Sequence, residues 1–254
     1  VDSKLIYLES SLFDSPIAAI YTPFSFILLY EVYLVIYYLP KSITTYIGKQ
    51  YEIITLIIIR RIFKDLSDLK LSSSWFEIKN DLQFTYDIIA SIILFYLLYL
   101  FYRKSRKKQE VPLKIINSNI DIFITFKKAV ATCLVPVLII IAVYSFSNWI
   151  SALINPEIMI GASFKNINNI FFDEFFTLLI LVDVILLLAS FYYTDKFHKV
   201  IRNSGFIIST ILIRLSFSVS GLLNTVLIVG AIVFGLLILI IHNKFEEELN
   251  QNMI

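Results

Sequence analysis

The sequence is poor in the residues that build most catalytic and metal sites. It has one Cys, two His and only 17% charged residues. A single thiol excludes an internal disulfide and an iron–sulfur cluster held by this chain alone. His198 and His242 lie at the ends of apolar runs, so we expect neither a membrane-embedded haem with two His ligands nor a zinc site of clustered imidazoles.

Sequence motifs that carry catalysis are also missing. There is no GxxxxGK[ST] phosphate loop, no HExxH and no GxSxG. Six Gly and six Pro residues give no obvious pair of broken helices, which many secondary transporters use at their substrate site. The one thiol, Cys133, lies in an apolar run and is interpreted as a small buried hydrophobe. We therefore expect no enzymatic activity, no cofactor and no metal.

Hydrophobic residues dominate what remains. They make up 58% of the chain, and the mean hydropathy is +0.79. A soluble fold of this length leaves much of its area in water and could not hide so much apolar surface, so the bilayer must be part of the solvent. The sequence predicts an all-α, multi-pass integral membrane protein in which residues 1–254 form a single membrane domain. Net charge is only +2, and the basic residues flank apolar runs, so no nucleic-acid partner is expected.

Five apolar runs are clear candidates for crossing a membrane, which takes about 20 residues. They are Pro16–Leu39, Phe84–Tyr102, Ala129–Ile150, Phe175–Tyr193 and Leu222–Ile241. Two shorter segments, residues 51–66 and 206–218, are ambiguous, because runs of such length are more often buried or interfacial than spanning. The sequence thus predicts five spans, or seven if both short segments cross.

Basic residues predict the orientation of the loops. The richest loop is 103–128, which opens with Arg103, Lys104, Arg106, Lys107 and Lys108. Lys and Arg accumulate in cytoplasmic loops, so this loop is predicted to face the cytoplasm. Lys196, Lys199 and Arg202 place the segment after Tyr193 on the same side, and the loop 151–174 on the other. Which membrane holds the protein does not follow from the sequence.

The two short segments resemble each other. IITLIIIRRIF (Ile53–Phe63) aligns without gaps on IISTILIRLSF (Ile207–Phe217), and FSFILLYEV aligns upstream on FTLLILVDV, which sets Glu31 opposite Asp183. Two parallel repeat halves, 16–102 and 175–241, would then be joined by the span 129–150. A chance match between Ile-rich segments is the alternative.

The region after residue 206 allows two structures. Residues 206–241 could form one tilted helix with a seam of small and polar side chains. Alternatively, the SVSG stretch (Ser218–Gly221) could form a tight turn between two helices. The first structure places the C-terminus outside, and the second places it on the side of the basic loop.

Ionisable residues inside apolar runs are the candidate functional residues: Glu31, Asp183, Arg60, Arg61 and Arg214. An ionised group at mid-membrane costs roughly 2.5–3.5 kcal/mol on insertion scales, so such groups pair or face water. We expect Glu31 to pair with Arg60 or Arg61, and Asp183 with Arg214, although pairs across the two repeat halves would also neutralise these charges. These pairs would either fix helix packing, which we favour, or line an ion path.

Two functional hypotheses follow from these features. The first is a non-enzymatic accessory or scaffolding subunit, which packs in the lipid bilayer against other membrane subunits or further copies of itself. It rests on the missing chemistry and on loops too short for a catalytic domain. The alternative is an ion channel or ion-coupled conductor that uses Glu31, Asp183 and Arg214.

Overall fold

The computed structural model describes residues 27, 30–67, 79–106, 118–154, 160–193, 197–219 and 221–251, and these contain helices and turns but no strand. The helices are α2 (Ile43–Ser67), α3 (Lys79–Arg106), α4 (Ser118–Ile154), α5 (Ile160–Tyr193), α6 (Phe197–Ser216) and α7 (Leu222–Gln251). A short helical segment at residues 30–38 precedes them. The prediction of an all-helical fold is confirmed for the described residues.

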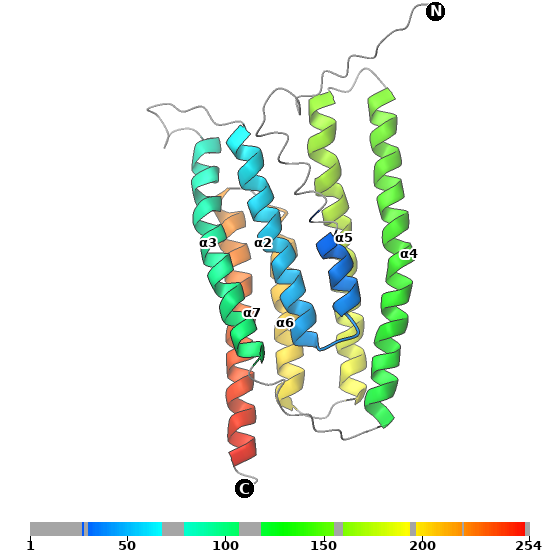
Figure 1. Cartoon of the computed structure of the whole chain (residues 1–254), viewed down its shortest axis with the longest axis vertical. Coiled ribbons are helices and arrows are strands. Elements are labelled where there is room, and N and C mark those ends of the chain that lie inside the picture. The colour runs from blue at the N-terminus through cyan, green and yellow to red at the C-terminus, as the bar shows by residue number, and fades with distance from the viewer. Residues whose placement is uncertain are drawn as a thin grey trace, which may run out of the picture.

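The helices form one bundle in which successive helices run in opposite directions (Figure 1). The helices α2, α3, α6 and α7 pack together, α5 packs on α6, and α4 lies at the edge against α5. The start of α6 therefore lies at the same end as the end of α3 and the start of α4 (Figure 1). The basic residues at the end of α3 and at the start of α6 thus share one end, but the side of the membrane that this end faces stays a prediction.

Four helices are long and apolar enough to cross a membrane. The spans are Leu82–Ser105, Asp121–Tyr144, Glu174–Tyr192 and Leu222–Leu249, and they match four of the five clear apolar runs. Most of the fifth run, Pro16–Leu39, lies outside the described residues. The chain is therefore a helical, multi-pass membrane protein, whereas the crossing of α2 and α6, and with it a count of five or seven, stays a prediction.

A turn separates α6 from α7, so the alternative of one continuous helix over 206–241 is wrong. The amides of Phe217, Ser218 and Val219 donate to carbonyls three residues back, at 3.1–3.2 Å, which tightens the end of α6. Gly221 then adopts φ +74°, a conformation that glycine reaches at little cost. The chain reverses there, and α7 returns to the end at which α6 began (Figure 1).

The directions in which the helices run are compatible with the predicted internal repeat, but they do not test it. Both α2 and α6 run away from the basic end, and α3 and α7 run back towards it (Figure 1). Parallel repeat halves require this arrangement, but any alternating bundle also produces it. The repeat of 16–102 on 175–241 therefore stays a prediction.

The bundle is apolar outside and partly polar inside. Ile92, Ile140 and Val143 expose 67%, 67% and 61% of their surface, whereas Asp87 and Asp183 are buried. Lipid solvates apolar side chains, so their burial is not favoured there. Polar groups receive no hydrogen bonds from lipid and need partners within the protein. This distribution agrees with the membrane location indicated by the spans.

Candidate functional site: two buried acids

Asp183 lies in the middle of α5 with only 3% of its surface exposed. Its carboxylate accepts hydrogen bonds from the amide of Gln50 on α2, at 3.2 and 3.5 Å. The hydroxyl of Thr210 on α6 lies 3.1 Å from the Gln50 carbonyl oxygen, and Tyr46 lies beside the carboxylate. Three helices therefore meet at Asp183 through neutral polar side chains. We name Tyr46, Gln50, Asp183 and Thr210 the Asp183 centre.

The Asp183 carboxyl group has no cationic side chain beside it in the described part of the chain. Among the residues that the structure describes, no Lys, Arg or His side chain lies within ion-pair distance of Asp183. The expected pair with Arg214 is not formed, because the Arg214 Nε donates instead to the Thr177 hydroxyl at 3.0 Å. Arg214 follows Thr210 by four residues, about one helical turn, and so meets α5 one turn or more away from Asp183.

Asp87 on α3 is the second buried acid, with 0% of its surface exposed. It forms an ion pair with Arg61 of α2, in which Nε and Nη2 of the guanidinium contact both carboxylate oxygens. Gln83 and Thr225 also donate to it, at 2.8 and 3.3 Å. Oδ1 thus accepts three hydrogen bonds and Oδ2 accepts one, and the donor that contacts both oxygens is charged.

Arg61 also joins the turn between α6 and α7 to the same network. Its Nη1 donates to the Asn224 side-chain oxygen at 2.8 Å, and the Asn224 amide donates to the Ser216 carbonyl at 2.6 Å. That carbonyl belongs to the last residue of α6 and has no partner within its own helix. We name Arg61, Gln83, Asp87, Asn224 and Thr225 the Arg61 network; it ties α2, α3 and α7 together and reaches α6 through the Ser216 carbonyl.

The sequence predicts that Glu31 pairs with Arg60 or Arg61, but the structure joins Glu31 to neither arginine. Glu31 is half-buried, and the groups around it are Glu52 and Lys49 of α2. Lys49 forms an ion pair with Glu52 at 2.6 Å, and the Tyr102 hydroxyl of α3 donates to the other Glu52 oxygen. Two acids therefore share one lysine at this place in the bundle.

Arg60 precedes Arg61 but occupies another face of α2. It is buried, with 6% of its surface exposed, whereas the Arg61 side chain is 28% exposed. Adjacent helical residues differ by about 100° in direction, so the two arginines cannot serve one partner in the same way. The structure thus separates the five candidate residues into different environments.

A close approach of α2, α6 and α7 lies next to the Asp183 centre. The Tyr51 and Ser209 hydroxyls are 2.7 Å apart, and Ser209 donates to the Ala231 carbonyl at 2.6 Å. A Cβ atom on Gly235 would lie 1.9 Å from the Tyr51 hydroxyl oxygen. Only glycine fits between these side chains, because real Cβ contacts are never that short.

The sequence interpretation missed Asp87, Gln50 and Asn224. Asp87 was visible as an acid three residues inside the predicted run Phe84–Tyr102, and this was the signal that could have identified it. Gln50 and Asn224 are neutral and gave no comparable signal.

The interpretation of Cys133 as a buried residue is wrong, since it is exposed on α4. Of the basic loop, Arg103 is exposed and Lys104 and the helix end at Arg106 are described, while Lys107 and Lys108 lie outside the described residues.

Comparison of the chain with protein-family models, with curated proteins and with solved structures gives no match. The interpretation of these polar centres therefore depends on their geometry.

Proposed function

We propose that this protein is a non-enzymatic membrane subunit that assembles with other membrane proteins through α4. The observation that carries the proposal is the position of this helix. Only 22% of its membrane-span window is buried inside the chain, the lowest share among the four spans, compared with 28% for α3, 39% for α5 and 44% for α7. The helix lies at the edge of the bundle (Figure 1), where the described residues leave part of its surface for other proteins.

The exposed face of α4 also has the residue types that helix contacts in membranes use. Thr125, Ala129, Thr132 and Cys133 are exposed on one side of its first half. The hydroxyls of both threonines donate to carbonyls of their own helix at 2.9 Å, so neither needs a further partner. Small side chains let two helix backbones approach closely, and this contact replaces the hydrophobic effect that lipid removes.

The internal network supports the same function. Arg61 and Asp87 hold each other inside the chain, so the buried ion pair needs no partner subunit. A bundle stabilised in this way can bind another subunit through α4 and keep its own fold. We assign the Arg61 network to packing, the role favoured from the sequence for Arg61.

Cross-linking from the single natural cysteine tests the proposal. A photoreactive maleimide on Cys133 in native membranes is expected to give one protein adduct of defined mass, which peptide sequencing identifies. The control is Cys133→Ser with Ile92→Cys, because Ile92 is 67% exposed on α3, at the other side of the bundle from α4 (Figure 1). Adducts with lipid alone from both positions would refute assembly through α4.

A second candidate function is ion-coupled conduction, and the Asp183 centre favours it. An ionisable residue inside a membrane protein is by default a candidate for an ion or proton pathway, and Asp183 has neutral neighbours. Purified protein in liposomes would then carry a current or a proton flux that Asp183→Asn or Glu31→Gln changes. The subunit proposal predicts no flux from the chain alone, so a flux altered by either variant would reverse the ranking.

A further inference from the structure

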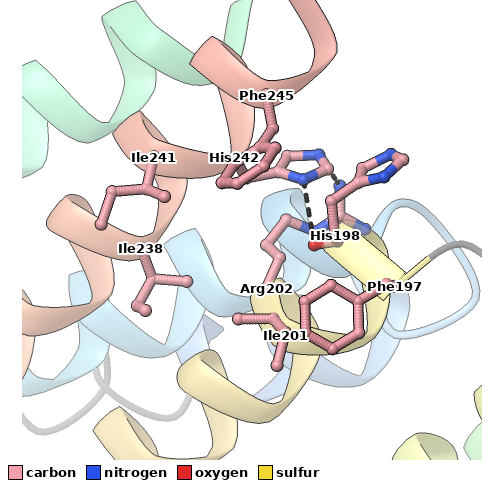
Figure 2. Close-up of a pocket in the computed structure, with 8 residues that line it drawn as sticks. All are labelled: Phe197, His198, Ile201, Arg202, Ile238, Ile241, His242 and Phe245. Atoms are coloured by element: carbon pink, nitrogen blue, oxygen red, sulfur yellow. Dashed lines mark hydrogen bonds between the residues drawn. The ribbon is translucent and has the colours of Figure 1, made fainter. Parts of the chain in front are cut away.

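Two histidines distant in the sequence meet where α6 begins and α7 ends. The rings of His198 and His242 stack with centroids 5.3 Å apart and planes at 23° (Figure 2). Glu246 follows His242 by one helical turn. The side chains of His198, His242 and Glu246 are 12%, 2% and 17% exposed. The sequence-based expectation that the chain has no clustered imidazoles is therefore wrong, because the α6–α7 turn brings the two together.

The three side chains have the spacing of ligands around one ion. Nε2 of each histidine lies 3.5 Å from the same Glu246 oxygen, Oε1, and one ligand atom from each residue lies within 4.8 Å of the others. In a tetrahedral zinc site with bonds of about 2.0–2.2 Å, neighbouring ligand atoms are roughly 3.3–3.5 Å apart. Two of the three edges therefore already have the required length.

His242 is also held in the orientation that a metal ligand needs. Its Nδ1 lies 3.2 Å from the His198 backbone carbonyl, which can only accept a hydrogen bond, so we assign the ring proton to Nδ1. The lone pair is then on Nε2, the atom that faces Glu246. Metal-binding histidines usually donate their other ring N–H in this way, which fixes the tautomer and the ring plane.

A cavity beside the imidazoles provides room for a further ligand. Its volume is about 50 Å³, and a water molecule occupies about 30 Å³ in the liquid. Its walls are mainly apolar and come from both helices (Figure 2), with Phe197, Ile201, Ile238, Ile241 and Phe245 around the two histidines and Arg202. A water molecule could thus complete four-coordination without a fourth protein ligand.

The guanidinium of Arg202 opposes a cation here. Its Nη1 lies 3.0 Å from His242 Nε2 (Figure 2), and an ion would have to replace that contact. The guanidinium keeps other partners when Nη1 moves, because Nε and Nη2 both donate to the Asn203 side-chain oxygen, at 3.2 and 3.0 Å. Its charge weakens the binding of any cation nearby.

We propose that His198, His242 and Glu246 bind one divalent transition-metal ion of the zinc type, which clamps the open end of the α6–α7 hairpin. Two imidazoles and a carboxylate favour Zn²⁺ and its first-row neighbours over Ca²⁺ and Mg²⁺, which prefer oxygen ligands. The site joins the start of α6 to the end of α7, at the end of the hairpin opposite the turn. It is independent of α4 and of the Asp183 centre.

The test uses the full chain purified in detergent through a tag without histidine, because the chain has only two His. A Cys133→Ser background removes the one thiol. We expect one Zn²⁺ per chain after dialysis and visible absorption bands with Co²⁺ as a spectroscopic substitute. His242→Ala and Glu246→Gln are expected to weaken Zn²⁺ binding by more than the roughly 10- to 100-fold that loss of an outer ligand partner costs.

Two further variants make the test specific. Glu247→Gln removes an adjacent exposed carboxylate and is expected to leave the affinity unchanged. Arg202→Gln is expected to tighten binding by about tenfold or more, since it removes a positive charge beside the ion. Zn²⁺ should also raise the Tm of the parent chain but not that of His242→Ala, because only a site in the folded state stabilises it. The proposal fails if neither the parent nor Arg202→Gln binds Zn²⁺, or if Glu246→Gln and His242→Ala bind as tightly as the parent.

Discussion

Asp87 and Asp183 are both buried, but the groups that contact their carboxylates differ in charge. Their exposed fractions are 0% and 3%, yet Asp87 faces the guanidinium of Arg61, whereas Asp183 faces the neutral amide of Gln50. Burial of an ionised group is costly unless an opposite charge and hydrogen bonds meet it. The first acid is thus a structural group held by its pair, and the second is the group most open to a change of charge or of bound ion.

The largest effect is expected from Arg61→Met, which removes the cation and leaves Asp87 buried. Loss of one partner of a buried ion pair typically costs about 3–5 kcal/mol, so the free energy of unfolding in detergent should fall by about that amount. Addition of Asp87→Asn to the same chain should restore part of the loss, because the uncompensated charge is gone. Equal stability of the single and double variants would show that Asp87 does not depend on the charge of Arg61.

An intermediate effect is expected at the close approach beside the Asp183 centre. Gly235→Ala places a methyl group 1.9 Å from the Tyr51 hydroxyl oxygen, and overpacking of this kind costs about 1–3 kcal/mol. Gly230→Ala is the matched control on the same helix, since a Cβ there meets nothing within 4 Å. That control should be neutral or stabilising by up to about 1 kcal/mol through helix propensity. Thermal unfolding of both variants measures the difference, and equal Tm values would contradict this packing.

The two acids also show what sequence patterns can and cannot predict. Apolar length identified the helix that carries each acid, because a bilayer requires about 20 apolar residues. The partners of the charged residues were not identified: Glu31 was paired with Arg60 or Arg61, and Asp183 with Arg214, because an ionised group in lipid needs an opposite charge or water. The sequence gives positions along a helix but not the face that meets a neighbour. Arg60 and Arg61 are adjacent in sequence and lie on different faces, and only the packing of α2 on α3 selects Arg61 for Asp87.

The end of the α6–α7 hairpin illustrates the same limit. The SVSG stretch left a turn and a continuous helix equally open, and Gly221 with φ +74° decides between them. Once the chain turns, residues near 198 and 242 must meet, since α6 and α7 are antiparallel. The paired imidazoles follow from that reversal, which a sequence pattern alone did not establish.

A smaller loss is expected from Thr210→Val at the Asp183 centre. Val has nearly the same shape as Thr but cannot donate to the Gln50 carbonyl oxygen, 3.1 Å away. A lost neutral hydrogen bond contributes about 0.5–1.5 kcal/mol, so stability should fall within that range. Thr132→Val on the exposed side of α4 is the matched control, with little change expected. A loss at position 210 as large as that of Arg61→Met would mean that the neutral centre holds the bundle as firmly as the ion pair.

The smallest change is expected from Asp183→Asn. Asn keeps the shape and one acceptor oxygen for the Gln50 amide, and it removes an ionisable group that has no described cation beside it. The free energy of unfolding should therefore change by less than about 1 kcal/mol, or rise, because a buried charge without a partner is itself destabilising. Denaturant titration in the same detergent as for Arg61→Met gives the comparison directly. A loss of about 3 kcal/mol or more would show that Asp183 is ionised and held by a partner, as Asp87 is, and the difference between the two acids would disappear.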